Sequence, residues 1–63
     1  MKIGEVLKEH REERGLSVIE VAKQLGIDRT TYFRYENGEV KNIPNDKLFK
    51  LMSLLEIDVK EII

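Results

Sequence analysis

The segment from Arg29 to Arg34 carries side chains with the chemistry to contact the edges of DNA base pairs. Their spacing places four of them on one face of a helix: Arg29, Thr30, Phe33 and Arg34. In the major groove, arginine suits guanine, whereas small hydroxyl and apolar groups suit thymine. An ordinary exposed helix face would contain the same residue types. The pattern therefore predicts base reading only if the neighbouring residues present 28–36 as a recognition helix.

Five further residues are candidates for binding the phosphates beside such a groove. Proteins hold phosphates with hydroxyl, amide and cationic side chains and with the N–H groups at helix N-termini. The residues of these types around the same segment are Ser17, Lys23, Thr31, Asn37 and Lys41. Each is equally well explained as a helix cap or a solvated charge. A phosphate-binding role is favoured only if they share one side of the unit.

The sequence offers little for catalysis or metal binding. It contains no cysteine and one histidine, His10, which alone cannot build a metal cluster. His10 follows Val6 and Leu7 at helical spacing, so a partly packed ring at the edge of a helix is expected. No carboxylate pair, nucleophile with a base, or phosphate-cradling glycine loop is visible. We therefore expect a protein that is not an enzyme and needs no cofactor or metal.

The size and charge of the chain limit what it can be. Its 63 residues suffice for a single domain with one small core. Apolar runs are short, against the roughly 20 residues of a membrane span, so a cytoplasmic protein is expected. The 11 basic and 12 acidic residues give a net charge of −1, which is less basic than most DNA-binding domains. Their distribution matters more, because salt screens charges beyond about 8–10 Å.

Capping residues predict a helix-turn-helix unit over 17–37. Ser17 and Glu20 form an S-x-x-E pattern, in which the two side chains cap backbone N–H groups reciprocally at a helix start. Gly26 then ends this helix after about two turns. Asp28 is a natural N-cap for a third helix that runs through Asn37, and the Asn37-Gly38 pair is a stop signal at its end. Two short helices joined by a glycine-containing turn are the elements of this unit.

The remaining segments predict three more helices and no strand. Helical spacing of apolar residues begins near the N-terminus and predicts a helix over 2–14. Pro44 suits the first turn of a fourth helix. Asp58 and Glu61 look like a second capping pair that opens a short fifth helix. The predicted fold is an all-α, compact five-helix bundle in a single domain, 1–63.

The order of these residues resembles the signature of the Cro and phage-repressor type of helix-turn-helix proteins, often called the XRE family. The resemblance covers nearly the whole chain and is specific; it implies a lambda-repressor-like DNA-binding domain. The central matching run is Gly15-Leu16-Ser17-x-x-Glu20-Val21-Ala22-x-x-Leu25-Gly26-Ile27-x-x-Thr30-Thr31-x-x-Arg34-Tyr35-Glu36-Asn37-Gly38, and helix 1 adds Ile3, Leu7 and Arg11.

The resemblance also implies partners and one structural contact. It implies a homodimer on a palindromic or pseudo-palindromic double-stranded DNA operator, with a role in regulating transcription. It further implies an ion pair between Arg11 and Glu36 across the packing of the first helix on the third. The apolar residues Val59, Ile62 and Ile63 would either form the dimer interface or close the small core.

Three residues depart from the family pattern. Val18 stands where family members commonly carry a glutamine that helps hold a phosphate. Tyr32 occupies an inward position that is usually aliphatic, and Phe33 follows where a polar residue is common. The sequence leaves open whether Phe33 touches a thymine methyl group or packs against a neighbour.

Two classes of function remain. The first is a sequence-specific transcriptional regulator, such as a phage-type repressor, a regulator of a mobile element, or an antitoxin that represses its own operon. The second is a protein-interaction module that uses Phe33, Tyr32 and the apolar residues of helix 5 on the same fold. The near-neutral charge and Val18 favour the second class. The turn chemistry and the two arginines of the recognition face favour DNA.

Overall fold

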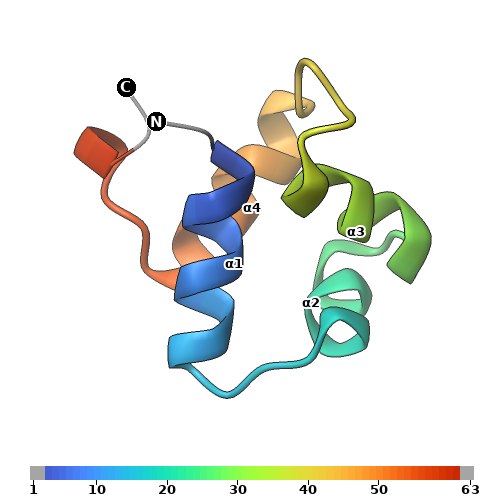
Figure 1. The fold of residues 1–63 in the computed structure, drawn as a ribbon, viewed down its shortest axis with the longest axis horizontal. Helices are drawn as coiled ribbons and strands as arrows, with labels where there is room; N and C mark the ends of the chain where they lie inside the picture. Colours follow the sequence, from blue (N-terminus) through green and yellow to red (C-terminus); the bar gives the residue numbers. More distant parts are fainter. Residues whose placement is uncertain (1–2, 62–63) are drawn as a thin grey trace.

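Four α-helices make up most of the chain that the structure describes. A computed structural model describes residues 3–61, and no strand occurs among them, so the predicted all-α class is confirmed. Figure 1 shows the elements in chain order: α1 (Ile3–Glu13), α2 (Val18–Leu25), α3 (Arg29–Asn37), α4 (Asn45–Leu55) and a 3-10 turn, η1 (Val59–Glu61). No helix in this part of the chain is long and apolar enough to cross a membrane.

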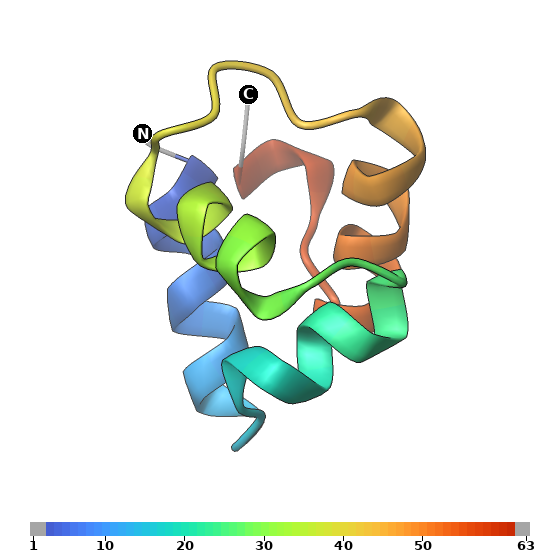
Figure 2. The same ribbon diagram turned by 90° about the vertical axis from the view of Figure 1, so that its right-hand side faces the viewer.

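The four helices enclose one apolar core. α1 packs against both α3 and α4, and α2 packs against α3 and α4. Figure 2 looks directly onto the α2 and α3 pair, with the loop from α3 to α4 arching above it. Every α-helix contributes at least two buried side chains, which are Val6, Leu7, Val21, Ala22, Leu25, Tyr32, Tyr35, Leu51 and Leu55, and Ile57 closes the core after α4. Removing these apolar surfaces from water is the main favourable term in folding.

The three helices whose bounds were predicted, α1, α2 and α3, begin and end within one residue of the prediction. The first helix, predicted over 2–14, is observed as Ile3–Glu13 within the described residues. The fourth begins directly after Pro44, which is its N-cap residue rather than part of its first turn. The apolar stripe of α4 faces inward, with Leu51 and Leu55 fully buried.

The predicted fifth α-helix is wrong for the residues that the structure describes. Only the 3-10 turn η1 forms there, closed by a 2.9 Å bond from the Glu61 N–H to the Asp58 carbonyl. The Glu61 carboxylate does accept the Asp58 N–H at 2.9 Å, as a capping pair requires. The Asp58 carboxylate, however, accepts the Lys60 N–H at 3.0 Å and leaves the Glu61 N–H free for the 3-10 bond. Ile62 and Ile63 lie outside the described residues.

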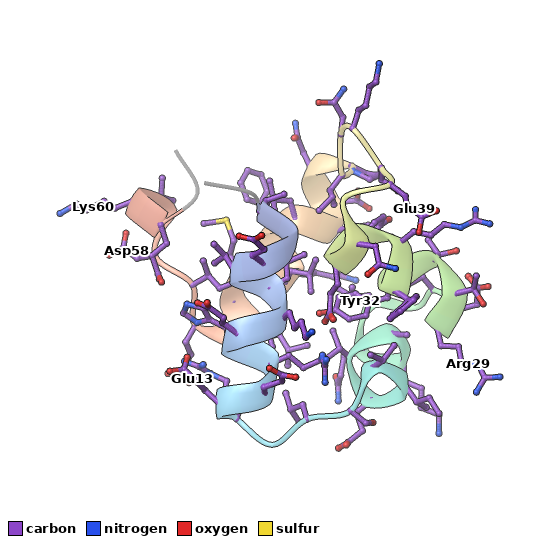
Figure 3. All side chains as sticks on the ribbon, viewed as in Figure 1. Glu13, Arg29, Tyr32, Glu39, Asp58 and Lys60 are labelled. Atoms are coloured by element: carbon purple, nitrogen blue, oxygen red, sulfur yellow. The ribbon has the colours of Figure 1, made fainter. Side chains whose placement is uncertain are left out.

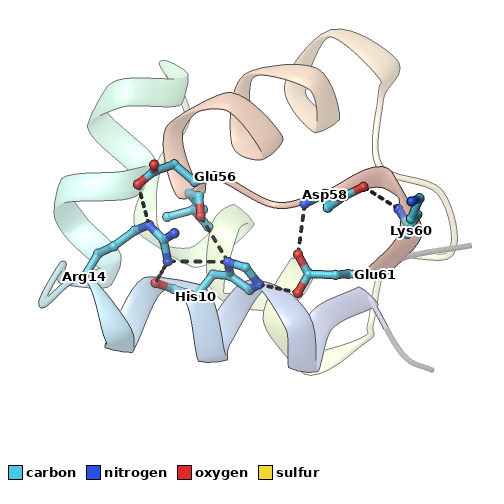
Figure 4. Close-up of polar contacts among 7 residues, drawn as sticks. His10, Arg14, Glu56, Asp58, Lys60 and Glu61 are labelled. Atoms are coloured by element: carbon cyan, nitrogen blue, oxygen red, sulfur yellow. Dashed lines mark hydrogen bonds and ion pairs between the residues drawn. The ribbon is translucent and has the colours of Figure 1, made fainter.

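His10 joins α1 to the end of α4 and to η1 (Figure 4). Its Nδ1 lies 3.1 Å from the Leu55 carbonyl oxygen and its Nε2 lies 2.7 Å from a Glu61 carboxylate oxygen. Both of these oxygens are acceptors, so the protonated ring satisfies both contacts by donating from each nitrogen. An Nη of Arg14, which is a donor, also lies 3.4 Å from Nδ1. The bond to Glu61 raises the pKa of His10 above its ordinary 6.5, although burial of the ring and the nearby Arg14 guanidinium oppose this shift. Arg14 is itself paired with Glu56 at 3.2 Å.

We predict that stability falls as His10 loses its proton. Because the pKa of His10 is raised in the folded state, its protonation stabilises the fold fully below the ordinary pKa of 6.5. That contribution is lost as pH rises through the folded-state pKa. Thermal unfolding of the parent and of His10→Gln between about pH 5.5 and about pH 8.5 should therefore show a parent advantage at low pH that shrinks at high pH. A difference in Tm that stays constant across this range contradicts the prediction.

Candidate nucleic-acid interface

The turn between α2 and α3 is held by bonds that the local sequence specifies. At the start of α2, the Ser17 hydroxyl accepts the Glu20 N–H at 3.1 Å and the Glu20 carboxylate accepts the Ser17 N–H at 3.0 Å, so the predicted capping box is confirmed. At its end, Gly26 adopts φ 73°, a left-handed conformation that glycine reaches without strain. The Lys47 ammonium donates to the Leu25 carbonyl at 3.1 Å and adds a cation at the helix C-terminus. These bonds fix the direction in which the chain enters α3.

The α3 helix has one buried and one exposed face. Tyr32, Tyr35 and Glu36 are buried, as their helical spacing predicts. Figure 3 shows Tyr32 pointing into the domain and Arg29 pointing away from it. The outward face brings together the four residues expected to read bases, Arg29, Thr30, Phe33 and Arg34, all of which are exposed. Phe33 is 51% exposed, which is unusual for a large apolar side chain.

Asp28 plays a different part from the one predicted. It occupies the N-cap position of α3, but its carboxylate makes no bond to a backbone N–H there. Instead it accepts a hydrogen bond from the Thr31 hydroxyl, and this bond lowers the pKa of Asp28. The geometry differs because the hydroxyl one turn ahead competes with the backbone N–H groups for the short carboxylate. The Thr31 hydroxyl proton is therefore engaged within the domain.

The phosphate candidates fall in separate places. Asn37 and Lys41 line one hollow beside the end of α3, and the Asn37 amide donates to the Glu39 carboxylate at 3.5 Å. Ser17 is exposed at the start of α2, where its hydroxyl still has a proton to donate. Lys23 is also exposed, but it lines a hollow shared with Leu54 of α4. The structure therefore does not group Lys23 with the exposed face of α3.

Sequence reasoning missed the contribution of Val18 to this surface. Val18 lies in the first turn of α2 and lines a hollow with three residues of α3: Arg29, Thr30 and Phe33. The predicted unit indicates that α2 and α3 pack together, but which residues of α2 face α3 depends on how the two helices cross, and spacing in the sequence does not give this. Within residues 3–61, no group of three histidine or acidic side chains is placed to hold a metal ion.

Arg11 and Glu36 form the ion pair that joins α1 to α3. The Arg11 Nε donates to one Glu36 carboxylate oxygen at 2.7 Å and an Nη donates to the other at 3.2 Å. The second Nη donates to the Leu16 carbonyl at 2.9 Å. The side chains of Arg11 and Glu36 are 12% and 3% exposed, and the bond to Glu36 raises the pKa of Arg11.

The buried hydroxyl of Tyr32 has no hydrogen-bond partner among the described residues, and burial raises its pKa.

Gly4 allows the backbones of α1 and α3 to come close together. A Cβ atom at this position would clash with the Glu36 carbonyl oxygen and lie 2.7 Å from the Tyr35 carbonyl oxygen. Both neighbours are backbone atoms of a packed helix, so they cannot move away cheaply. This close contact fixes the position of α3 relative to α1, in addition to the Arg11–Glu36 pair.

With this geometry established, comparison with known proteins assigns the family. A helix-turn-helix family model matches residues 7–62. The chain therefore belongs to the Cro and phage-repressor type of helix-turn-helix proteins, as its sequence resemblance predicts. No solved structure gives a significant match.

Three proteins, each named a candidate HTH-type transcriptional regulatory protein, are similar to the chain. The protein from Thermoplasma volcanium is 36% identical over 56 residues, which are 89% of this chain and 17% of the relative. The protein from Pyrobaculum aerophilum is 45% identical over 38 residues, or 60% of this chain and 15% of the relative. The protein from Thermococcus kodakarensis is 50% identical over 36 residues, or 57% of this chain and 11% of the relative. The chain thus spans only a small part of each relative's length.

We predict that breaking the buried ion pair from either side destabilises the domain. Arg11→Met and Glu36→Gln each leave one buried charge without its partner, which typically costs about 3–5 kcal/mol. The control is Arg14→Met, which removes the arginine that directly follows α1 and pairs with the exposed Glu56, and should cost about 1 kcal/mol or less. Urea unfolding measures all three. Arg11→Met and Glu36→Gln variants as stable as the control would show that the pair does not hold α1 on α3.

We also predict that Gly4→Ala is destabilising, although alanine is the better helix former. In an open helix this change would stabilise by about 0.5–1 kcal/mol. Here the added methyl group meets backbone atoms of α3, and overpacking of this kind costs about 1–3 kcal/mol. Glu9→Ala, at an exposed position of the same helix, serves as the control and should change stability by about 0.5 kcal/mol or less. An increase in Tm for Gly4→Ala would contradict the close backbone contact between α1 and α3.

Proposed function

We propose that the chain is the DNA-binding domain of a transcriptional regulator and that it places α3 in the major groove of double-stranded DNA. The observation that carries the proposal is the outward face of α3, with its four exposed residues on a helix whose other face is buried. A recognition helix needs this arrangement, because its contacting side chains must reach base edges while its position stays fixed. Family membership and the names of the relatives support the same function.

The proposed contacts follow from the chemistry of each side chain. Arg29 and Arg34 read guanine or hold a phosphate, since a guanidinium offers two parallel donors to either group. Thr30 and Phe33 contribute to specificity through a hydroxyl and an apolar contact. Phosphate contacts are assigned to Ser17, Asn37 and Lys41. Thr31 would bind a phosphate only when its hydroxyl proton leaves the Asp28 carboxylate, and Lys23 lies away from the exposed face of α3.

The net charge of −1 is compatible with this proposal because of where the charges lie. Glu13 on α1 and Arg29 at the start of α3 lie on opposite sides of the domain (Figure 3), whose longest extent is 26 Å. At ordinary salt, charges separated by more than about 8–10 Å are largely screened. Glu13 therefore repels DNA bound at α3 only weakly. Glu5, which shares a hollow with Asn37, and Asp28 and Glu39 are closer to that surface and should weaken its salt-dependent attraction.

A dimer completes the proposal, because one domain of this size makes few contacts with DNA. Two copies related by a two-fold axis would read the halves of a palindromic or pseudo-palindromic operator. Val59 is 51% exposed and is available to contact a second copy. A repressor-like role, a cytoplasmic location and the absence of enzymatic activity belong to the same proposal.

A protein-interaction role is the second candidate, and exposed aromatic side chains favour it. Phe33 is 51% exposed and Phe49 is 65% exposed, and apolar side chains left in water often mark binding surfaces. Tyr32, which sequence reasoning included in this surface, is fully buried and cannot contact a partner. An antitoxin-type regulator would bind both DNA and a protein.

We predict that DNA binding requires the two arginines of α3. Fluorescence anisotropy with random duplexes, and with duplexes enriched by selection on the parent, should show binding that weakens as salt is raised. Arg29→Ala/Arg34→Ala should weaken binding to the enriched duplex by about 100-fold, because each bidentate arginine contributes about 1–3 kcal/mol.

The matched control is Lys50→Ala/Lys60→Ala, which removes the same charge from exposed positions of α4 and η1. Its effect on affinity should be small and independent of sequence. If the parent binds no duplex at low salt and high protein concentration, the DNA-binding proposal fails for this chain. Equal losses in the two double variants would show that total charge, rather than α3, determines binding.

A further inference from the structure

The hollow between the starts of α2 and α3 is lined by two apolar and two polar residues. Val18 and Phe33 form its apolar walls, and Arg29 and Thr30 complete it. Its volume is about 220 Å³. Phe33 is 51% exposed, and neither the Phe33 side chain nor the Val18 side chain carries a group that can form a hydrogen bond. The hollow therefore favours an apolar group from any ligand that covers this face.

We propose that this hollow receives the 5-methyl group of a thymine, and that Val18 and Phe33 together make the protein prefer thymine at one position of each half-site. The inference rests on the proposed function, since it names the chemical group that the exposed face of α3 recognises. It assigns a specificity role to Val18, which sequence reasoning treated only as a lost phosphate contact.

The chemistry of the major groove leaves one natural occupant for such a hollow. The thymine methyl is the apolar group that base pairs display there, whereas the other base edges present hydrogen-bond donors or acceptors. An amino or carbonyl group placed against Val18 and Phe33 would lose its water without gaining a partner, which is costly. A methyl group in the same place gains from leaving water.

The polar residues of the hollow suit the surroundings of such a methyl group. The Arg29 guanidinium carries the charge that complements a phosphate or the acceptor atoms of a neighbouring guanine. The Thr30 side chain supplies both a methyl group and a hydroxyl, so it can contact either an apolar or a polar part of a base. An apolar site with cationic and hydroxyl neighbours is thus matched to a thymine in duplex DNA.

The test is removal of that methyl group from a bound duplex. A sequence enriched by selection on the parent is prepared with each thymine replaced in turn by deoxyuridine, which lacks only the methyl. One position per half-site should lose affinity about fourfold, the effect expected from burying one methyl group. Cytosine at that position should bind more weakly than 5-methylcytosine, which restores the methyl group.

Variants of the hollow connect this effect to its walls. Phe33→Ala and Val18→Gln should bring the affinity ratio of the thymine and deoxyuridine duplexes close to one. Phe49→Ala removes an exposed phenylalanine from α4 and should leave the ratio unchanged. Circular dichroism confirms that each variant is folded before binding is measured.

Each outcome decides the inference. If the parent binds DNA but every deoxyuridine duplex binds as well as its thymine counterpart, the methyl site is wrong and the proposed function still stands. If a methyl effect persists in Phe33→Ala and Val18→Gln, another surface recognises thymine. If the parent binds no DNA, the proposed function and this inference fail together, and the hollow would instead suit an apolar side chain of a protein partner.

Discussion

The contact of α1 with the C-terminal half of α3 determines the rest of the structure. Arg11 holds Glu36 with two hydrogen bonds of 2.7 and 3.2 Å, and Gly4 lets the two backbones meet beside this pair. A buried charge pair has few alternative arrangements, because each displaced partner would be left without its counter-charge. Glu36 is therefore fixed on the inner side of α3, and with it the rotation of the helix. The buried contacts on the inner face of α3 therefore determine which of its residues face outward.

The turn before α3 adds the second constraint. Gly26, in its left-handed conformation, reverses the chain just after α2, and Lys47 of α4 binds the Leu25 carbonyl at the same point. The N-terminus of α3 is thus placed by the turn from α2, whose end is bound by α4, while its C-terminal half is held by α1. A short helix has little stability of its own, so contacts with neighbouring helices at both ends are needed to keep it in one orientation.

The features that could be predicted from sequence are local ones. The Ser17–Glu20 capping box and the two faces of α3 depend on residues a few positions apart, whose relative placement in a helix is fixed. Prediction failed where a side chain in a local pattern had a competing hydrogen-bond partner. Asp28 bonds to the Thr31 hydroxyl instead of capping the backbone, and Asp58 bonds to Lys60, so a 3-10 turn forms where an α-helix was expected. Short acidic side chains have several such partners within reach.

Other features depend on contacts between distant segments, which spacing alone does not reveal. The close approach at Gly4 requires knowing which helix lies opposite, and glycine near a helix start has no distinctive local signal. The hollow between Val18 and Phe33 arises only when α2 and α3 are packed together. The two faces of α3 have different roles. Tyr32 and Glu36 on the inner face contribute to stability. Residues on the outer face, such as Phe33, can therefore change what the domain recognises without changing how it folds.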